Sequence, residues 1–273
     1  QLKKLAESVG LPLFEQAGKR PYLSDAGRAL YQSCVEVADS LERLEMQISD
    51  MKGLKQGRLR LAVVTTIEYF APRVLGRFCE RYPGIDVELK VTNRKRLLER
   101  ITRNQDDLYI LGQPPENMEL DARPFMPNPL VVLAPRGHPL AGRKRIPLGR
   151  LLEEPFILRE PGSGTRKTVE KLFADHGLKA RVRLELGSNE AIKQAVAGGL
   201  GLAVLSHHTL SLEGDDGPLA VLDVEHFPLE RQWYLVYPAG KRLSIVAQAF
   251  YDFLMHEGAS QRGVTPAGNS GST

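Results

Sequence analysis

Residues 159–167 read REPGSGTRK, a glycine-rich turn that leads into a helix-like segment and carries positive charge. Free backbone N–H groups, the hydroxyl of Thr165 and the charge of Arg166 at a helix start would suit a bound anion without any catalysis. The stretch is not a Walker A phosphate loop, because Thr165 and Arg166 separate the last glycine from Lys167. A plain alternative stays open, in which Thr165 only caps the helix and Arg166 lies in solvent.

Small polar residues also occupy other places where a predicted strand gives way to a helix. In open α/β sheets, ligands lie outside the carboxyl ends of the strands and near helix N-termini. One such junction is ordinary capping, but five that point at one cleft favour a polar ligand. The five segments are 64–66 (VTT), 92–94 (TNR), 112–113 (GQ), 162–166 (GSGTR) and 187–190 (GSNE).

A catalytic constellation is absent from the sequence. There is no G-x-S-x-G motif, and Ser163 has no evident His and acid partners. The adjacent carboxylates at 106–107 and 153–154 would point apart and make poor acid/base couples. The six His are scattered, and Cys34 and Cys79 provide neither a metal site nor a disulfide framework. We therefore predict a binding protein without enzymatic activity, metal or cofactor.

Two α/β units would position these residues. From Arg58 to residue 113 the pattern alternates strands and helices as a βαβαβ unit. Residues 121–135 (DARPFMPNPLVVLAP) indicate a long strand that could pass between two lobes, and a second βαβ series follows. Residues 229–239 (LERQWYLVYPA) could be the returning strand, with Trp233 in the core, and SIVAQAFYDFLMHEG a final helix. This pattern predicts a bilobed receptor with its ligand between the lobes.

A long helix over about residues 25–52 carries the clearest periodicity, with Ser24 as its N-cap. Apolar residues recur in two interleaved sets of seven, which makes an a/d seam across three heptads. A helix that lies on its own domain is the alternative, but such a helix usually shows a broader apolar stripe. We predict that the helix pairs with a second chain through Leu30, Cys34, Val37, Leu41, Leu44, Ile48 and Met51.

The composition is that of an ordinary globular protein, with 42% hydrophobic and 26% charged residues in 273. Its apolar runs are too short to span a membrane. The net charge of 37 − 33 = +4 is spread along the chain, so charge alone does not identify a DNA-binding protein. The chain opens at Gln1 without a signal-like segment, from which we expect a lost natural N-terminus and a cytoplasmic protein.

Four segments resemble the LysR-type transcriptional regulators. Residues 1–27 (QLKKLAESVGLPLFEQAGKRPYLSDAG) are similar to the end of their DNA-binding domain, where a recognition helix runs into a wing. Residues 77–89, 130–141 and 195–206 extend the resemblance through the effector domain, so that it covers residues 1–258. The opening helices of the winged helix-turn-helix and the base-reading part of the recognition helix are absent, so we expect impaired specific DNA binding.

Within this family the chain resembles the CbbR group, regulators of carbon dioxide fixation (RuBisCO) operons. The segments that carry this similarity are VVTTIEYFAPRVLGRFC, KVTNRKRLLERI, DDLYILGQPPE and LREPGSGTR. The resemblance implies a phosphorylated or carboxylated metabolite, or NADPH, as effector. It also implies double-stranded DNA as a partner and a homo-oligomer, either dimer or tetramer.

The implied fold is α/β: a truncated winged helix-turn-helix, a long dimerising linker helix, and a two-lobed periplasmic-binding-protein-like (type II) effector domain. The predicted boundaries are 1–24 for the winged helix-turn-helix remnant, 25–57 for the linker helix and hinge, 58–130 and 239–258 for lobe I, 131–238 for lobe II, and 259–273 for a disordered tail.

Roles for single residues follow from the junctions and the resemblance together. For DNA, mainly as phosphate contacts, we predict Gln1, Lys3, Lys4, Lys19 and Arg20. For the effector we predict Thr65, Thr66, Asn93, Gln113, Thr165, Arg166, Ser188 and Asn189, with Arg94 and Glu160 as secondary candidates.

Two other functions are compatible with a bilobed body. A solute-binding protein would capture a small anion without binding DNA, but the seven-residue seam, the wing and the absence of a signal-like segment argue against it. A bilobed transferase would need a catalytic base, and none presents itself.

Overall fold

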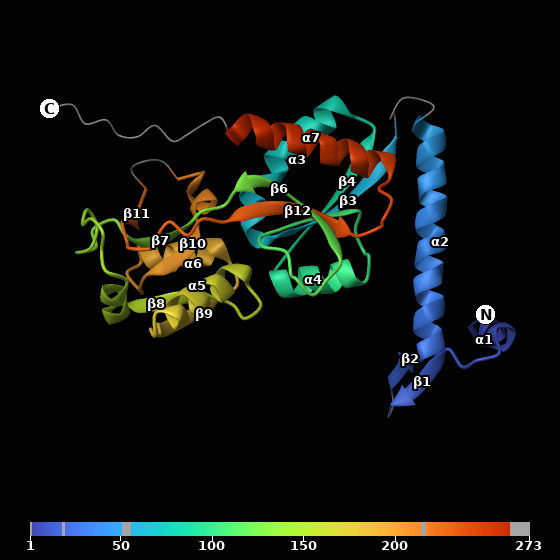
Figure 1. Ribbon diagram of the computed structural model, residues 1–273, viewed down its shortest axis with the longest axis horizontal. Helices are drawn as coiled ribbons and strands as arrows, with labels where there is room; N and C mark the ends of the chain where they lie inside the picture. Colours follow the sequence, from blue (N-terminus) through green and yellow to red (C-terminus); the bar gives the residue numbers. More distant parts are fainter. Residues whose placement is uncertain (1, 18–19, 51–55, 214–216, 263–273) are drawn as a thin grey trace.

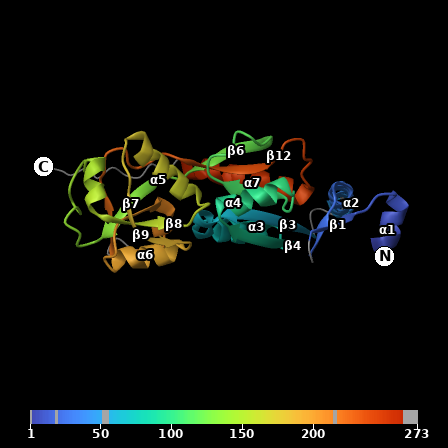
Figure 2. The ribbon, with the colours of Figure 1, turned by 90° about the horizontal axis from the view of Figure 1, so that it is seen from below.

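The computed structural model describes residues 2–17, 20–50, 56–213 and 217–262. Figure 1 shows a small N-terminal part, one long helix, and an elongated two-lobed body beside that helix. The view in Figure 2 agrees that lobe I lies between lobe II and the long helix.

The N-terminal part contains α1 (Leu2–Val9) and a hairpin of β1 (Phe14–Ala17) and β2 (Arg20–Leu23). Gly10, at φ 74°, directly follows the end of α1. The long helix α2 (Asp25–Asp50) begins after Ser24, whose Oγ accepts a hydrogen bond from the backbone N of Gly27 at 3.0 Å. The predicted N-cap of this helix is therefore confirmed.

The predicted seam of α2 is open along its described part. Leu30 is half-buried, and Cys34 is exposed. Val37, Leu41 and Leu44 are 60%, 58% and 51% exposed. The Ile48 side chain and Met51 lie outside the described residues.

Lobe I is a five-stranded sheet in the order β4-β3-β5-β12-β6. It contains β3 (Gly57–Val64), the short helix η1 (Thr65–Tyr69), α3 (Ala71–Arg81), β4 (Ile85–Thr92), α4 (Arg94–Thr102), β5 (Leu108–Leu111), β6 (Leu120–Pro127), β12 (Gln232–Pro238) and α7 (Ile245–Arg262). Strands β4, β3 and β5 are parallel, which confirms the βαβαβ prediction, and β12 runs antiparallel to β5 and β6. Phe78 of α3 and Phe250 of α7 pack on one face, and Leu97 of α4 is buried on the other.

Lobe II contains β7 (Leu130–Pro135), η2 (Leu148–Glu153), β8 (Pro155–Arg159), α5 (Gly164–Asp175), β9 (Arg181–Leu186), α6 (Asn189–Ala197), β10 (Ala203–Ser206), η3 (His207–Leu210) and β11 (Leu219–Leu222). Strands β8 and β9 are parallel, while β10 and β11 flank β7 in antiparallel fashion. A parallel bridge between Phe156 and Leu202 joins β8 to the segment before β10. The core holds an edge-to-face pair of Phe156 and Phe173.

The predicted boundary between the lobes is wrong for β12, which falls within the range 131–238 predicted for lobe II. Residues 232–238 hydrogen bond with β5 and β6, and they bury Trp233 and Leu235 in the lobe I core. The final helix also differs, because α7 continues to Arg262 rather than ending at 258. The remainder of the predicted tail, from 263, lies outside the described residues.

Two chain segments cross between the lobes. The long strand predicted over 121–135 is divided into β6 and β7 at Asn128 and Pro129, and a proline has no N–H for a continuous ladder. The backbone N of Asn128 donates to the carbonyl of Arg231 at 2.7 Å, and Leu130 and Leu229 exchange backbone hydrogen bonds. The two crossings are therefore bonded to each other. In the described part of the chain, none of the helices is long and apolar enough to cross a membrane.

Candidate ligand pocket between the lobes

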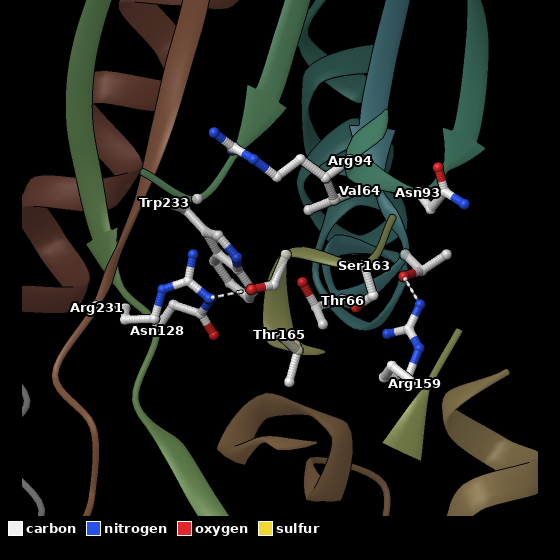
Figure 3. Close-up of a pocket in the computed structure, with 13 residues that line it drawn as sticks. Val64, Thr66, Asn93, Arg94, Asn128, Arg159, Ser163, Thr165, Arg231 and Trp233 are labelled. Atoms are coloured by element: carbon white, nitrogen blue, oxygen red, sulfur yellow. Dashed lines mark hydrogen bonds between the residues drawn. The ribbon is translucent and has the colours of Figure 1, made fainter. Parts of the chain in front are cut away.

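A pocket lies where the strand ends of lobe I meet the start of α5 and the two crossings (Figure 3). Its cavity volume is about 30 Å³. Its lining residues are Val64, Thr65, Thr66, Asn93, Arg94, Gly112, Asn128, Arg159, Ser163, Gly164, Thr165, Arg231 and Trp233.

Two helices begin at this pocket, one from each lobe. Asn93 caps α4 through its Oδ1, which accepts from the backbone N of Arg96 at 3.1 Å. Ser163 caps α5 with a longer contact of 3.5 Å to the backbone N of Arg166. Thr165, which the alternative interpretation made the cap of α5, lies instead within its first turn. Helix N-termini carry partial positive charge, so this meeting point favours a negatively charged ligand.

Two arginines of lobe I face the pocket without a carboxylate partner in the described part of the chain. Arg94 Nη1 is buried and forms no hydrogen bond, and burial lowers the pKa of this guanidinium. Burial also lowers the pKa of Arg231, and the nearby charge of Arg94 lowers it further. The Nη1 of Arg231 has one contact, at 3.5 Å, with the carbonyl of Gly164. Paired cations in a partly buried site are costly unless an anion neutralises them.

Gly112 leaves the space that Arg231 occupies. A Cβ at this position would collide with Nη2 of Arg231. The glycine after β5 therefore leaves room for the guanidinium in its present position, and a larger residue would push it aside.

Trp233 is in the core, as the sequence predicted, and also forms part of the pocket wall. The side chain is fully buried and packs against His208, with ring centroids 4.5 Å apart and the ring planes tilted by 32°. Its indole Nε1 is buried without a hydrogen-bond partner. A buried N–H donor of this kind calls for a physical explanation, and a ligand acceptor in the pocket would supply one.

Arg159 links the pocket to contacts between the lobes. Its side chain is 2% exposed and donates to Thr65 Oγ1 at 2.8 Å and to Asn189 Oδ1 at 2.7 Å. Asn189 is fully buried, and its Nδ2 lies 3.4 Å from Oε1 of Glu68, whose pKa is raised mainly by burial. Thr65, Arg159, Asn189 and Glu68 thus form an interlobe bridge that crosses the cleft twice. Beside it, the hydroxyl of Tyr69 donates to Glu190 at 2.6 Å.

Comparison with known proteins agrees with this architecture. A family model described as LysR substrate binding domain matches residues 52–259. The HTH-type transcriptional activator CmpR of Synechocystis sp. is 52% identical over 254 residues, which are 93% of this chain and 84% of the relative. The chain belongs to the LysR family of transcriptional regulators.

Two further proteins resemble this LysR regulator in sequence, and a third resembles it in fold. The RuBisCO operon transcriptional regulator of Acidithiobacillus ferrooxidans is 54% identical, over 93% of this chain and 82% of the relative. The regulatory domain of Synechocystis CcmR in complex with 2-PG is 56% identical, with a TM-score of 0.73, and the match covers 74% of this chain and 97% of that one. A full-length OxyR variant of Pseudomonas aeruginosa, at 20% identity, has a TM-score of 0.72 over 93% of this chain and 86% of that one, and supports the two-lobed fold alone.

Half of the residues predicted for the effector lie around the pocket of this LysR regulator. They are Thr65, Thr66, Asn93 and Thr165, and the secondary candidate Arg94 lines it too. The other secondary candidate, Glu160, pairs with Arg159 at 2.9 Å, and Asn189 holds Arg159 from behind.

Four of the eight predicted residues do not line the pocket, and Asn189 is one of them. Gln113 is exposed, because the chain turns away after Gly112. Arg166 points elsewhere, since ion pairs of 2.7 and 2.8 Å hold it to Glu170 and Glu185. Ser188 caps α6 by accepting from the backbone N of Ala191.

The structure adds lining residues that our predictions missed. Ser163 could have been found from the sequence, because it is a good N-cap residue directly before a helix. Asn128, Arg159 and Arg231 carry no local signal, since they reach the pocket only through the crossings and through the end of β8.

The residues predicted for DNA contact lie in the N-terminal part. Lys4 is exposed on α1. Lys3 lies within α1 and Arg20 within β2, while Gln1 and Lys19 lie outside the described residues. Their role in DNA binding stays a prediction.

Proposed function

We propose that this LysR regulator senses a small phosphorylated or carboxylated metabolite in the pocket and thereby controls carbon dioxide fixation genes. The observation that supports the ligand class best is the pair of Arg94 and Arg231, which face one pocket without a carboxylate between them. The relatives named as RuBisCO operon regulators support the target genes, and the related CcmR domain in complex with 2-PG supports a small anion.

An anion would complete the polar contacts of the pocket. One oxygen would accept from Arg94 Nη1 and another from Trp233 Nε1, which are buried donors in this pocket that have no hydrogen-bond partner. The hydroxyls of Thr66 and Thr165 lie in the same wall and would add weaker contacts. Hydrogen bonds to a charged acceptor are stronger than those between neutral groups, and the partly buried site strengthens them further.

Binding in this place would shift the balance between arrangements of the two lobes. The ligand contacts Arg94 from lobe I and Ser163 from lobe II, so it binds one degree of closure better than others. Such a difference in affinity is what a regulatory ligand needs in order to change a population.

The N-terminal part would supply the DNA contacts. We assign α1 and the β1–β2 hairpin to the end of a winged helix-turn-helix, with Lys3, Lys4 and Arg20 as phosphate contacts. The open apolar seam of α2 would pair two chains, and a DNA-bound regulator of this kind would be a homo-oligomer acting in the cytoplasm.

Two measurements test this function. Isothermal titration with 2-PG, inorganic phosphate, NADPH and uncharged glycerol should show binding of 2-PG and none of glycerol. In the source organism, a reporter fused to the promoter of the carbon dioxide fixation genes should lose its metabolite response when this gene is deleted. If the protein binds the anion but deletion of its gene leaves the reporter's metabolite response unchanged, the alternative is favoured. That alternative is a solute-binding protein that captures an anion without binding DNA.

A further inference from the structure

A second polar cluster lies at the end of lobe I that faces α2. Asp39 of α2 accepts from Nη2 of Arg60 at 3.4 Å and from Nδ2 of Asn104 at 3.1 Å. Arg60 is also bound to Asp107, at 3.3 Å between side chains and at 2.7 Å from its backbone N. The Nζ of Lys241 donates to Oδ1 of Asn104 at 2.8 Å. We call these five residues the junction cluster.

The junction cluster is mostly buried. The side chains of Asp39 and Asp107 are 14% and 11% exposed, and burial lowers the pKa of Lys241. Asn104 holds a φ of 46°, an unusual conformation that lets its amide reach both Asp39 and Lys241. Separating α2 from lobe I would leave the partly buried carboxylate of Asp39 without its partners, which costs free energy. We therefore expect this contact to hold α2 in one position on lobe I.

Helix α2 therefore has two different sides. At about 100° per residue, Asp39 lies nearly opposite the seam residues Val37 and Leu41. Gln32 and Glu36 lie on the same side as Asp39 and line a cleft against lobe I. One side of the helix contacts the effector lobe, and the other stays open to a second chain.

Three adjacent strands of the lobe I sheet run between the junction cluster and the ligand pocket. Strand β3 has Arg60 near its start, and Val64 at its end lines the pocket. Strand β5 follows Asp107 and ends before the pocket residue Gly112.

Strand β12 runs in the reverse direction between the same two places. Arg231 precedes it at the pocket, and Lys241 follows its far end. Hydrogen-bonded strands are stiff elements that can carry a displacement from one site to another.

We propose that the junction cluster fixes α2 to lobe I and transmits the state of the pocket to the linker helix along β3, β5 and β12. This inference rests on the proposed function for the identity of the ligand, but not for the contact itself. Asp39 is a positioning residue in this scheme, because it lies at the end of the sheet away from the pocket.

The first experiment needs no ligand. Amide hydrogen exchange is measured over residues 98–107 and 236–244, the lobe I segments at the cluster, in the intact chain. Asp39→Ala should raise exchange there severalfold, while Glu36→Ala, on the same side of α2, should not. Unchanged exchange over residues 57–64 shows that the lobe remains folded. Equal exchange in Asp39→Ala and the parent chain would overturn the proposal.

The second experiment tests transmission. Saturating 2-PG should change exchange over residues 32–44 in the parent chain and leave it unchanged in Asp39→Ala, although both bind 2-PG within about threefold by titration. A response retained in Asp39→Ala would refute the cluster's role.

A perturbation without ligand keeps this test independent of the proposed effector. Gly112→Ala displaces Arg231 from within the pocket, and it should change exchange over residues 32–44 only when Asp39 is present. If the parent chain binds neither 2-PG nor phosphate, the anion proposal fails, and the Gly112→Ala comparison still decides for or against the junction cluster.

Discussion

Arg94 and Arg231 lie at one pocket, and the charge of Arg94 adds to burial in lowering the pKa of Arg231. The two guanidiniums repel each other in a place where water screens them poorly. The pocket thus holds an electrostatic cost that a bound anion would remove.

Arg231→Ala should weaken binding of 2-PG about ten- to hundredfold, because a hydrogen bond to a charged group contributes about 1.5–3 kcal/mol. Isothermal titration measures this. Arg96→Ala removes an exposed arginine from the same region and should leave affinity within about twofold. Similar losses in both variants would mean that general positive charge, rather than the pocket, attracts the ligand.

Asn189→Ala should lower the free energy of unfolding by about 1–3 kcal/mol, because the buried guanidinium of Arg159 loses one of its hydrogen-bond partners, at 2.7 Å. Urea unfolding checks this value. Ser188→Ala, which removes only the cap of the same helix, should cost about 1 kcal/mol. A loss for Asn189→Ala no larger than that for a surface substitution would contradict the interlobe bridge.

Acid should destabilise the protein partly through His208. Burial lowers the pKa of His208 below its ordinary 6.5, against the raising effect of its hydrogen bond to the carbonyl of Pro127. The unfolded chain therefore binds the proton more readily, so this contribution to stability is complete above pH 6.5 and declines as the pH falls below it.

Thermal melting between about pH 8 and pH 5 measures the His208 effect. His208→Gln should flatten the decline in melting temperature, and His176→Gln, at an exposed position, should leave the profile as it is. An identical profile in His208→Gln would show that other groups cause the acid sensitivity.

Leu41→Asp should separate the oligomer into smaller units, because it places a charge in the apolar seam of α2. We expect the dissociation constant to rise about a hundredfold or more, by sedimentation velocity, since an unpaired charge in an interface costs several kcal/mol. Gln32→Asp adds the same charge on the other side of the helix and should leave the oligomer intact. Dissociation in both variants would point to a general loss of the helix.

Local patterns predicted the strand ends and helix starts of the pocket. The predictions were right for four residues, because ligands in α/β sheets lie outside the carboxyl ends of the strands, near helix N-termini. These residues are Thr65, Thr66, Asn93 and Thr165. The alternation of strands and helices predicted two lobes, the family resemblance implied the same fold, and the related structures agree with it.

The choice between two arginines could not be made from the same patterns. Arg94 and Arg166 both follow a predicted helix start, but only Arg94 turns into the pocket. Glu170, four residues after Arg166, draws that guanidinium along the helix surface. This i, i+4 pair is visible in the sequence, whereas the second partner, Glu185, comes from β9 and is visible only in the fold.

The error at β12 has a different cause. Its run of apolar residues predicts a strand but does not say which sheet the strand joins. That choice depends on the ladder with β5 and β6, which brings together residues more than a hundred positions apart.

The hydrogen bond between the two crossings, from Asn128 N to the carbonyl of Arg231, has a mechanical consequence. Both residues belong to the wall of the pocket, so a ligand bound there would lie at the hinge about which the lobes would turn. A small rotation at this hinge would move the outer ends of the two lobes through a much larger distance. The size of the movement at the outer ends then depends on the length of the lobes. Even a ligand of a few atoms could therefore cause a large movement there.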